Sequence, residues 1–218
     1  MIIADLHVHS HNSIDSFLDP QRIIEVALKR GLNCVAVTDH NTVRGGLELV
    51  REAKSYQGFI AIPGVELKTN IGDVILLFIE EEVKIKSYNE VLDYAESMDA
   101  LTVLAHPYRG HVMIDDVAKK VHAIEVLNSR SDKIANSKAY NLALKLGKPM
   151  IAGSDAHMAF EIGKAVTIVN GSTIEDVRKA IIKGSAQIAG SESNLMVHAF
   201  SLAAKLAKII MGKHKWDW

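Results

Sequence analysis

The chain has 218 residues, of which 48% are hydrophobic and 23% are charged, and its formal net charge is -1. This composition is typical of a globular protein with one sizeable core, and the near-zero charge gives no indication of a general nucleic-acid-binding surface. No apolar run approaches the ~20 residues of a transmembrane segment. The sequence enters its first predicted strand at once and leaves no room for a signal peptide, so we expect a cytoplasmic protein.

The chain begins with an apolar run, residues 2–4, followed by Asp5, His7, His9 and His11. The run predicts a short buried strand. Residues two apart on a strand face the same side, so these four side chains share one face if the strand continues that far. Neutral imidazoles are good metal ligands and a strand end holds them rigidly. The spacing therefore favours a metal site over a polar strand edge.

Short apolar runs alternate with helical patterns along the rest of the chain, without a linker or repeat. This alternation predicts one α/β domain with mainly parallel pairing and right-handed crossovers. Residues 66–69 and 73–79 suit a hairpin. Further strands are predicted at 34–37, 59–62, 101–105, 123–127, 149–152 and 165–169, and helices at 20–30, 45–56, 88–97, 114–121, 131–146 and 172–183.

Residues of the types that bind metals occur where the predicted strands end. In a closed α/β barrel the C-terminal ends of all strands meet on one face, where active sites are built. If these residues only capped separate helices and turns, they would have no reason to occur at the ends of the strands. We therefore predict that their side chains converge on one site. They are His7, His9, Asp15, His40, Glu66, His106, Asp155 and His157.

The end of the chain is predicted to form a separate helical extension. Residues 194–211 carry apolar side chains at helical spacing, and Trp216 and Trp218 follow them. We therefore predict a barrel domain at 1–190 and a C-terminal helical extension at 191–218. Its apolar stripe would pack on the barrel. A homodimer contact and a membrane-surface helix are the alternatives, and His198 and His214 are not predicted as ligands.

Short motifs follow one another from the N-terminus to about residue 160, and only their combination is specific. They are Asp5-Leu6-His7-Val8-His9-Ser10, Thr38-Asp39-His40-Asn41-Thr42, Pro63-Gly64-Val65-Glu66, Ala105-His106-Pro107 and Gly153-Ser154-Asp155-Ala156-His157. In this order they resemble the PHP family, the polymerase and histidinol phosphatase superfamily of metal-dependent phosphoesterases. The resemblance implies a distorted (β/α)7 TIM-like barrel, a metal site at the C-terminal ends of the strands, and hydrolysis of phosphate esters.

The resemblance also implies roles for single residues. The metal ligands would be His7, His9, Asp15, His40, Glu66, His106, Asp155 and His157. Glu66 matches a carboxylate that bridges metals, and with Asp155 and His157 it forms the expected catalytic set. Where some members have a histidine after the strand at 123–127, this chain offers Glu125 and Asn128. Asn128 lies nearer the strand end and is the predicted weak ligand or substrate contact, so the cluster would hold two or three divalent ions.

The donor types indicate the chemistry. Histidine with carboxylate suits Zn, Mn or Fe better than an all-oxygen Mg site. A water that bridges two such cations loses a proton near neutral pH and becomes a nucleophile, while the cations neutralise the phosphoryl oxygens. Asp39, beside His40, is predicted to orient a ligand imidazole. Capping of the next turn is the alternative for Asp39.

Binding of a phosphate substrate also needs positive charge near the predicted metal ligands at the strand ends. Arg109 and Arg130 each follow a predicted strand end within four residues, and either guanidinium can hold a phosphate with two parallel hydrogen bonds. Arg44 is a third candidate. A solvated loop position is the alternative for each arginine.

The sequence therefore predicts a metal-dependent hydrolase that uses a metal-bridging hydroxide on a small phosphomonoester or nucleotide. One alternative is a nuclease or polymerase-associated exonuclease-type phosphodiesterase. The near-neutral charge disfavours it, because tracking a polymer needs a basic groove, and no extended nucleic-acid surface is expected. A non-catalytic scaffold is the other alternative. The complete ligand set disfavours it, because buried carboxylates without a cation repel one another.

Overall fold

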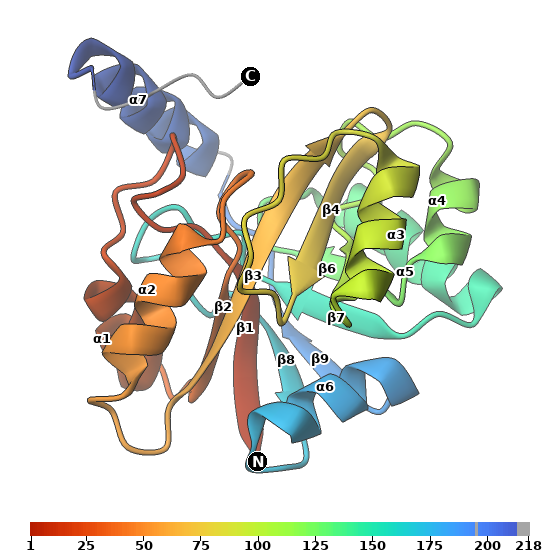
Figure 1. The fold of residues 1–218 in the computed structure, drawn as a ribbon, viewed down its shortest axis with the longest axis horizontal. Helices are drawn as coiled ribbons and strands as arrows, with labels where there is room; N and C mark the ends of the chain where they lie inside the picture. Colours follow the sequence, from red (N-terminus) through yellow and green to blue (C-terminus); the bar gives the residue numbers. More distant parts are fainter. Residues whose placement is uncertain (195, 213–218) are drawn as a thin grey trace.

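A computed structural model describes residues 1–194 and 196–212 (Figure 1). Within them nine strands form one sheet in the order β7-β6-β5-β4-β3-β2-β1-β8-β9, with helices around its outside. The strands are β1 (Ile2–Val8), β2 (Cys34–Val37), β3 (Ile60–Thr69), β4 (Gly72–Leu77), β5 (Leu101–Leu104), β6 (Ala123–Asn128), β7 (Met150–Gly153), β8 (Ala165–Val169) and β9 (Gln187–Gly190). The helices are α1 (Pro20–Lys29), α2 (Arg44–Ala53), α3 (Tyr88–Ser97), α4 (Ile114–Lys120), α5 (Lys133–Leu146), α6 (Ile174–Lys183) and α7 (Met196–Ile210).

Side chains bring β7, at one edge of the sheet, against β8 and β1. The Thr167 hydroxyl of β8 accepts from Ala152 N and donates to Ala152 O, each at 2.9 Å. Ser154 N, just after β7, donates to Asp5 Oδ1 of β1 at 2.9 Å. The sheet is therefore a nearly closed, distorted barrel, and the predicted TIM-like α/β fold is confirmed.

Local sequence explains the elements that position the site. All four residues of β2 are buried, as expected for a continuous apolar run. Asp19 caps α1 by accepting from Gln21 N at 2.9 Å, and Pro20 is the first helical residue. The β3–β4 hairpin is confirmed, with Glu66 opposite Ile75. These elements place the residues of the site at one end of the barrel.

Two features of the sheet differ from the prediction. β8 runs antiparallel to β1, because the segment between β7 and β8 contains no crossover helix that would return the chain for a parallel strand. β9 pairs antiparallel with β8 and was not predicted, since Gln187–Gly190 is short and mostly exposed and has no apolar run. Both departures lie at the edge of the sheet away from β2 to β6.

Helix α7 lies at the end of the barrel opposite the N-terminus (Figure 1). Its buried residues are Val197, Ser201, Ala204 and Lys208, whereas Leu202, Leu206, Ile210 and others of the predicted apolar stripe are exposed. The predicted boundary at residue 190 and the predicted dimer contact stay predictions. His214, Trp216 and Trp218 lie outside the described residues. Over residues 1–194 and 196–212, none of the helices has the length and apolarity to cross a membrane.

Candidate metal centre

The structure brings the predicted ligands together at the C-terminal ends of the strands. A cavity of about 230 Å³ opens above them, and the predicted Arg109 and Arg130 also line it. Asp15, His40, Glu66, His106, Asp155 and His157 line the cavity, and the buried side chains of His7 and His9 contact Glu66 and Asp155 from below. His11, the last histidine of the opening run, is exposed and pairs with Glu48, because β1 ends at Val8.

His7 and His9 face each other through their Nε2 atoms, which lie 3.1 Å apart. The other ring nitrogen of each is already bound: His7 Nδ1 lies 2.9 Å from Glu125 Oε1, and His9 Nδ1 lies 3.0 Å from Ser13 Oγ. A carboxylate only accepts, so His7 Nδ1 carries a hydrogen. Both Nε2 atoms are thereby directed at the same point.

The electrostatics around these two imidazoles favour a positive charge between them. Burial by itself would lower the pKa of His7, but the carboxylates of Glu125, Asp155 and Glu66 raise it well above its usual value. Burial and two neighbouring imidazoles lower the pKa of His9 to about 3, so His9 is neutral and offers a lone pair. The negative charge of these carboxylates, which favours a proton on His7, equally favours a metal cation beside it.

Glu66 lies at the centre of the cluster, where the long strand β3 passes the site. Its Oε1 is 2.9 Å from His106 Nε2, and its Oε2 is 2.9 Å from His40 Nδ1 and 3.5 Å from His7 Nε2. Burial acts to raise the pKa of Glu66, but His7, His40 and the hydrogen bonds hold it well below its usual value. Glu66 is therefore an ionised carboxylate with imidazoles on both oxygens.

Asp15 joins two imidazoles at the open side of the cluster. Its Oδ2 lies 3.2 Å from His157 Nε2 and 3.5 Å from His40 Nε2. His157 Nδ1 bonds the backbone oxygen of Asp155 at 2.8 Å, which leaves Nε2 directed at Asp15. The sequence position of Asp15, in a loop rather than at a strand end, still delivers it to the cavity.

Two of the candidate ligands have left-handed backbone conformations. His106 has φ 28° and Asp155 has φ 56°. Such angles are uncommon for residues other than glycine and concentrate at functional sites, where the surrounding structure holds them. Asp155 Oδ1 is 3.3 Å from His9 Nε2, and its Oδ2 accepts from Arg109 Nη2 at 2.5 Å. The turn conformation thus places this carboxylate between the imidazoles and an arginine.

Glu125 and Asn128 differ in their hydrogen bonds. Glu125 accepts from His7 Nδ1, from His106 N at 2.8 Å and from Asn128 Nδ2 at 3.0 Å, so it supports two candidate ligands from below. Asn128 Oδ1 accepts from Arg130 N at 2.9 Å. Its amide nitrogen and oxygen are both engaged by protein groups in this structure, and its role as a weak ligand or substrate contact stays a prediction.

Asp39 acts on His9 through a hydroxyl and does not touch an imidazole directly. Its Oδ1 accepts from Ser13 Oγ at 2.7 Å and from Ser10 N at 2.6 Å. Ser13 Oγ in turn accepts from His9 Nδ1, because its own hydrogen is donated to Asp39. The chain Asp39–Ser13–His9 therefore fixes the hydrogen of His9 on Nδ1, and an orienting role for Asp39 stays a prediction.

This arrangement requires glycine at position 45. A Cβ added to Gly45 would overlap the Asp39 carboxylate and the Ser10 hydroxyl. We expect Gly45→Ala to displace Asp39 and weaken metal binding by about 10–100-fold, the usual range for loss of such support. Metal titration of the purified variant measures this, with Arg51→Ala, at an exposed position of the same helix, as control. Equal metal affinity in both variants would contradict the role given to Asp39.

The three predicted arginines have different surroundings. Arg109 reaches Asp155 and is partly exposed to the cavity. Arg130 is buried, and its Nε and Nη2 donate to Glu161 at 2.8 and 2.7 Å, so Glu161 already occupies two of its donors. Arg44 has a 73% exposed side chain beside Glu82, and the structure does not bring it into the cavity.

Some residues of the site were not singled out from the sequence. Asp73, the second residue of β4, lines the cavity, and its carboxylate has an oxygen within 4.8 Å of ligand atoms of Glu66 and His106. Buried Asp5 accepts from Ser154 and Gly163, and desolvation raises its pKa to about 6. Asp5 was noticed for its spacing, but only the fold shows that it supports the loop after β7.

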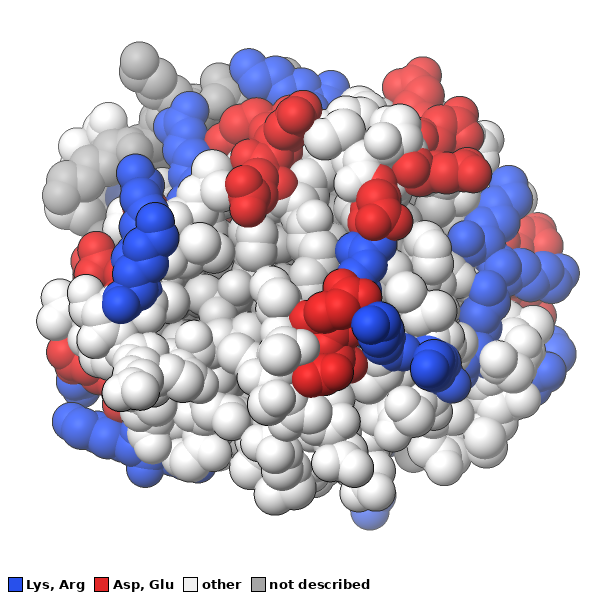
Figure 2. Space-filling view, turned by 60° about the horizontal axis from the view of Figure 1, so that its bottom comes forward, with Lys and Arg blue, Asp and Glu red and all other residues white. Residues whose placement is uncertain are grey.

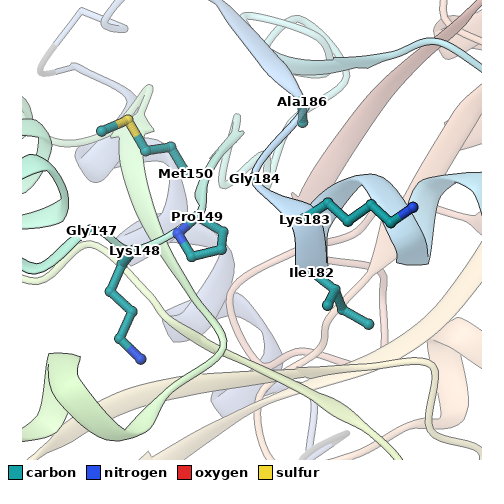
Figure 3. A pocket seen from close by; sticks show the side chains of 8 residues that line it. All are labelled: Gly147, Lys148, Pro149, Met150, Ile182, Lys183, Gly184 and Ala186. Atoms are coloured by element: carbon teal, nitrogen blue, oxygen red, sulfur yellow. The ribbon is translucent and has the colours of Figure 1, made fainter.

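A second hollow, of about 400 Å³, lies at the other end of the barrel (Figure 3). It is formed where α5 and α6 end in left-handed glycines, Gly147 and Gly184. Its lining residues include no His, Asp or Glu. The side chains of Lys148 and Lys183 extend away from each other (Figure 3), and Lys148 Nζ donates to a backbone oxygen. This hollow therefore has none of the groups needed for metal chemistry.

The donor set fits divalent cations. Groups of three ligand atoms lie within 4.8 Å of one another, and they overlap, so that neighbouring cations could share ligands. Two neutral lone pairs 3.1 Å apart, with carboxylates around them, are unfavourable unless a positive charge lies between them. The groups are His9/His40/His157, His7/His9/Glu66, His7/His106/Asp155 and Glu66/Asp73/His106.

Comparison with known proteins agrees with this geometry. A family model described as PHP-associated matches residues 133–186. An uncharacterised protein of Methanocaldococcus jannaschii is 33% identical over 160 residues, which cover 65% of this chain and 91% of that protein. The 5'-3' exoribonuclease Rnm of Salmonella typhimurium is 27% identical over 173 residues, covering 78% of this chain and 52% of that enzyme.

A solved structure shares the fold. A two-domain protein from Bacteroides vulgatus, described as containing a PHP-like metal-dependent phosphoesterase, superposes with a TM-score of 0.76 at 17% identity, covering 93% of this chain and 69% of that chain. The chain belongs to the PHP superfamily. As a member of this superfamily it is a hydrolytic enzyme, a metal-dependent phosphoesterase. PHP phosphoesterases bind divalent metals, and the buried histidine and carboxylate groups described above suit them.

Proposed function

We propose that this PHP protein hydrolyses small phosphate monoesters, using two or three Zn, Mn or Fe ions. One observation carries the proposal: the imidazole and carboxylate donors face the same small cavity as the guanidinium of Arg109. Ligands for cations and a fixed positive charge for a phosphate are thus combined in one concave site. The mixture of nitrogen and oxygen donors supports Zn, Mn or Fe over Mg.

The chain's own residues would orient the reactants. Glu125 and Ser13 hold the Nε2 atoms of His7 and His9 toward one point, and Glu66 supplies negative charge beside them. When bound, divalent cations there acidify a water and neutralise the charge of the phosphoryl group. Arg109 adds a charge-assisted hydrogen-bond donor at the rim.

A nuclease activity is the second candidate, because the Salmonella typhimurium relative is a 5'-3' exoribonuclease. The formal net charge of -1 gives no sign of an extended basic track. On the face drawn in Figure 2, at the end of the barrel away from the cavity, Lys and Arg side chains are interleaved with Asp and Glu. Strands of nucleic acid are usually followed by a continuous positive groove. We therefore favour the small substrate.

Hydrolysis of a substrate panel tests this choice. Purified protein of measured metal content would be given p-nitrophenyl phosphate, sugar phosphates, cyclic nucleotides and short 5'-phosphorylated oligoribonucleotides. We expect the highest kcat/KM for a phosphomonoester of a small molecule, and loss of all activity after chelation. Faster turnover of the oligoribonucleotides than of every small monoester would contradict the proposal and favour the nuclease.

Arg109 is the arginine that we expect to hold the substrate phosphate. Its guanidinium is partly exposed and bonds Asp155, so it can turn toward a bound anion. Arg109→Ala should lower kcat/KM by about 10–100-fold, since a hydrogen bond between charged groups is lost. Arg109→Lys should recover part of this, because it keeps the charge but loses the planar fork.

The controls separate binding from metal loss. Metal content should be equal in wild type, Arg109→Ala and Arg109→Lys, because guanidinium is not a ligand. Arg44→Ala, at the exposed arginine outside the cavity, is the matched control and should keep wild-type kinetics. Unchanged kcat/KM in metal-replete Arg109→Ala would show that other groups hold the phosphate.

A further inference from the structure

Helix α7 crosses the mouth of the cavity and is attached to the rim on both sides. At one end His198 Nε2 lies 3.2 Å from the backbone oxygen of Arg130. Toward the other end Lys208 Nζ donates to the backbone oxygens of His11 and Ser13, at 2.6 and 2.5 Å. These two attachments are ten residues apart, about 15 Å along a helix axis. The helix therefore spans the opening from the end of β6 to the loop that carries Asp15.

The face of α7 turned to the barrel is mixed: Val197 and Ala204 are buried beside the polar Ser201 and Lys208. The larger apolar side chains Leu202 and Leu206 are 58% and 52% exposed. Most helices on a globular protein bury the apolar stripe and expose the polar one. Burial of apolar surface therefore accounts for only part of this orientation, because the inner face also carries two polar side chains.

Ser201 is the polar residue of this face that reaches the cavity. Its side chain lines the cavity together with Asp155 and His157, and the residue is 7% exposed. Among the described residues its hydroxyl has no hydrogen-bond partner, although a helical serine commonly bonds the carbonyl four residues earlier. A buried hydroxyl without a partner is unfavourable. At the wall of a substrate cavity it is a donor and acceptor that a ligand can use.

We propose that α7 forms one wall of the substrate pocket and that the Ser201 hydroxyl bonds the bound substrate. This inference rests on the proposed phosphomonoesterase function and narrows its substrate class. The cavity of about 230 Å³ is smaller than the roughly 300–1,000 Å³ of sites for drug-sized ligands. The substrate would therefore be a phosphomonoester with a short, hydroxyl-bearing leaving group.

Four variants test the proposal in the full-length, metal-replete protein. Ser201→Ala removes the hydroxyl, Ser201→Thr keeps it, and Ser201→Phe fills the cavity. Leu206→Ala, on the exposed face of the same helix, is the control. The probes are glycerol 3-phosphate and ribose 5-phosphate, for which kcat, KM and binding by calorimetry are measured, together with metal content and thermal unfolding.

For both probes we expect Ser201→Ala to lower kcat/KM about 3–10-fold, in the range of one neutral hydrogen bond. Ser201→Thr should restore most of the loss, and Ser201→Phe should lower kcat/KM more than tenfold with metal content unchanged. Leu206→Ala should match wild type. Equal kcat/KM in wild type, Ser201→Ala and Ser201→Phe would overturn the inference and leave the proposed function standing.

Binding separates the inference from the function on which it rests. If wild type binds the probes, hydrolyses neither, and loses about 3–10-fold in affinity in Ser201→Ala, the assignment of Ser201 is supported and phosphomonoesterase activity on this class is rejected. If wild type neither binds nor hydrolyses either probe, the inference is overturned, because the pocket then takes another class of molecule.

Discussion

Glu66→Gln is expected to lower turnover by about a hundredfold or more while the fold stays intact. Glu66 contacts His106 and His40 at 2.9 Å and lies 3.5 Å from His7 Nε2. Glutamine keeps the shape but removes the negative charge and directs an amide N–H at an imidazole nitrogen. The charge that would hold neighbouring cations is then missing from the centre of the cluster.

The measurement is kcat on protein of known metal content, with circular dichroism to check the fold. Glu90→Gln, at an exposed position of α3, makes the same chemical change outside the site and should keep wild-type turnover. A folded Glu66→Gln protein with a full complement of metal and near-normal turnover would contradict the role proposed for Glu66.

Glu161→Gln is expected to destabilise the protein by about 3–5 kcal/mol, because it leaves the charge of Arg130 buried without its partner. The pair is buried: the side chain of Arg130 is 4% exposed and that of Glu161 is 0% exposed. Glu161 Oε2 also accepts from His157 N at 3.1 Å and from Met158 N at 3.0 Å. Loss of this carboxylate should therefore also displace His157 and lower activity.

Urea unfolding measures the stability change. Glu25→Gln breaks the exposed Arg22–Glu25 pair of α1 and should change stability by no more than about 0.5 kcal/mol. Arg130→Met combined with Glu161→Leu replaces the whole pair by apolar side chains and should regain much of the lost stability. A loss below about 1 kcal/mol in Glu161→Gln would show that water reaches the pair and that burial does not control its energy.

Arg130 shows what a local sequence pattern can and cannot predict. Its distance from the end of β6 indicated correctly that it lies at the rim of the cavity. Its main partner, Glu161, lies 31 residues away in the chain, in a loop without an apolar pattern. Because the pairing depends on how β6 and β7 lie side by side, the sequence offered no signal that this guanidinium was already bound.

The sequence by itself determined the alternation of strands and helices and the grouping of ligand-type residues at strand ends. Both follow from local periodicity, because apolar runs select strands and barrel closure gathers their C-terminal ends. The tertiary structure alone decided the direction of β8, the support of His7 by Glu125 and the inward turn of Ser201. These depend on contacts between residues far apart in the chain, and the hydrophobic pattern of a segment does not specify which polar side chain will meet which partner.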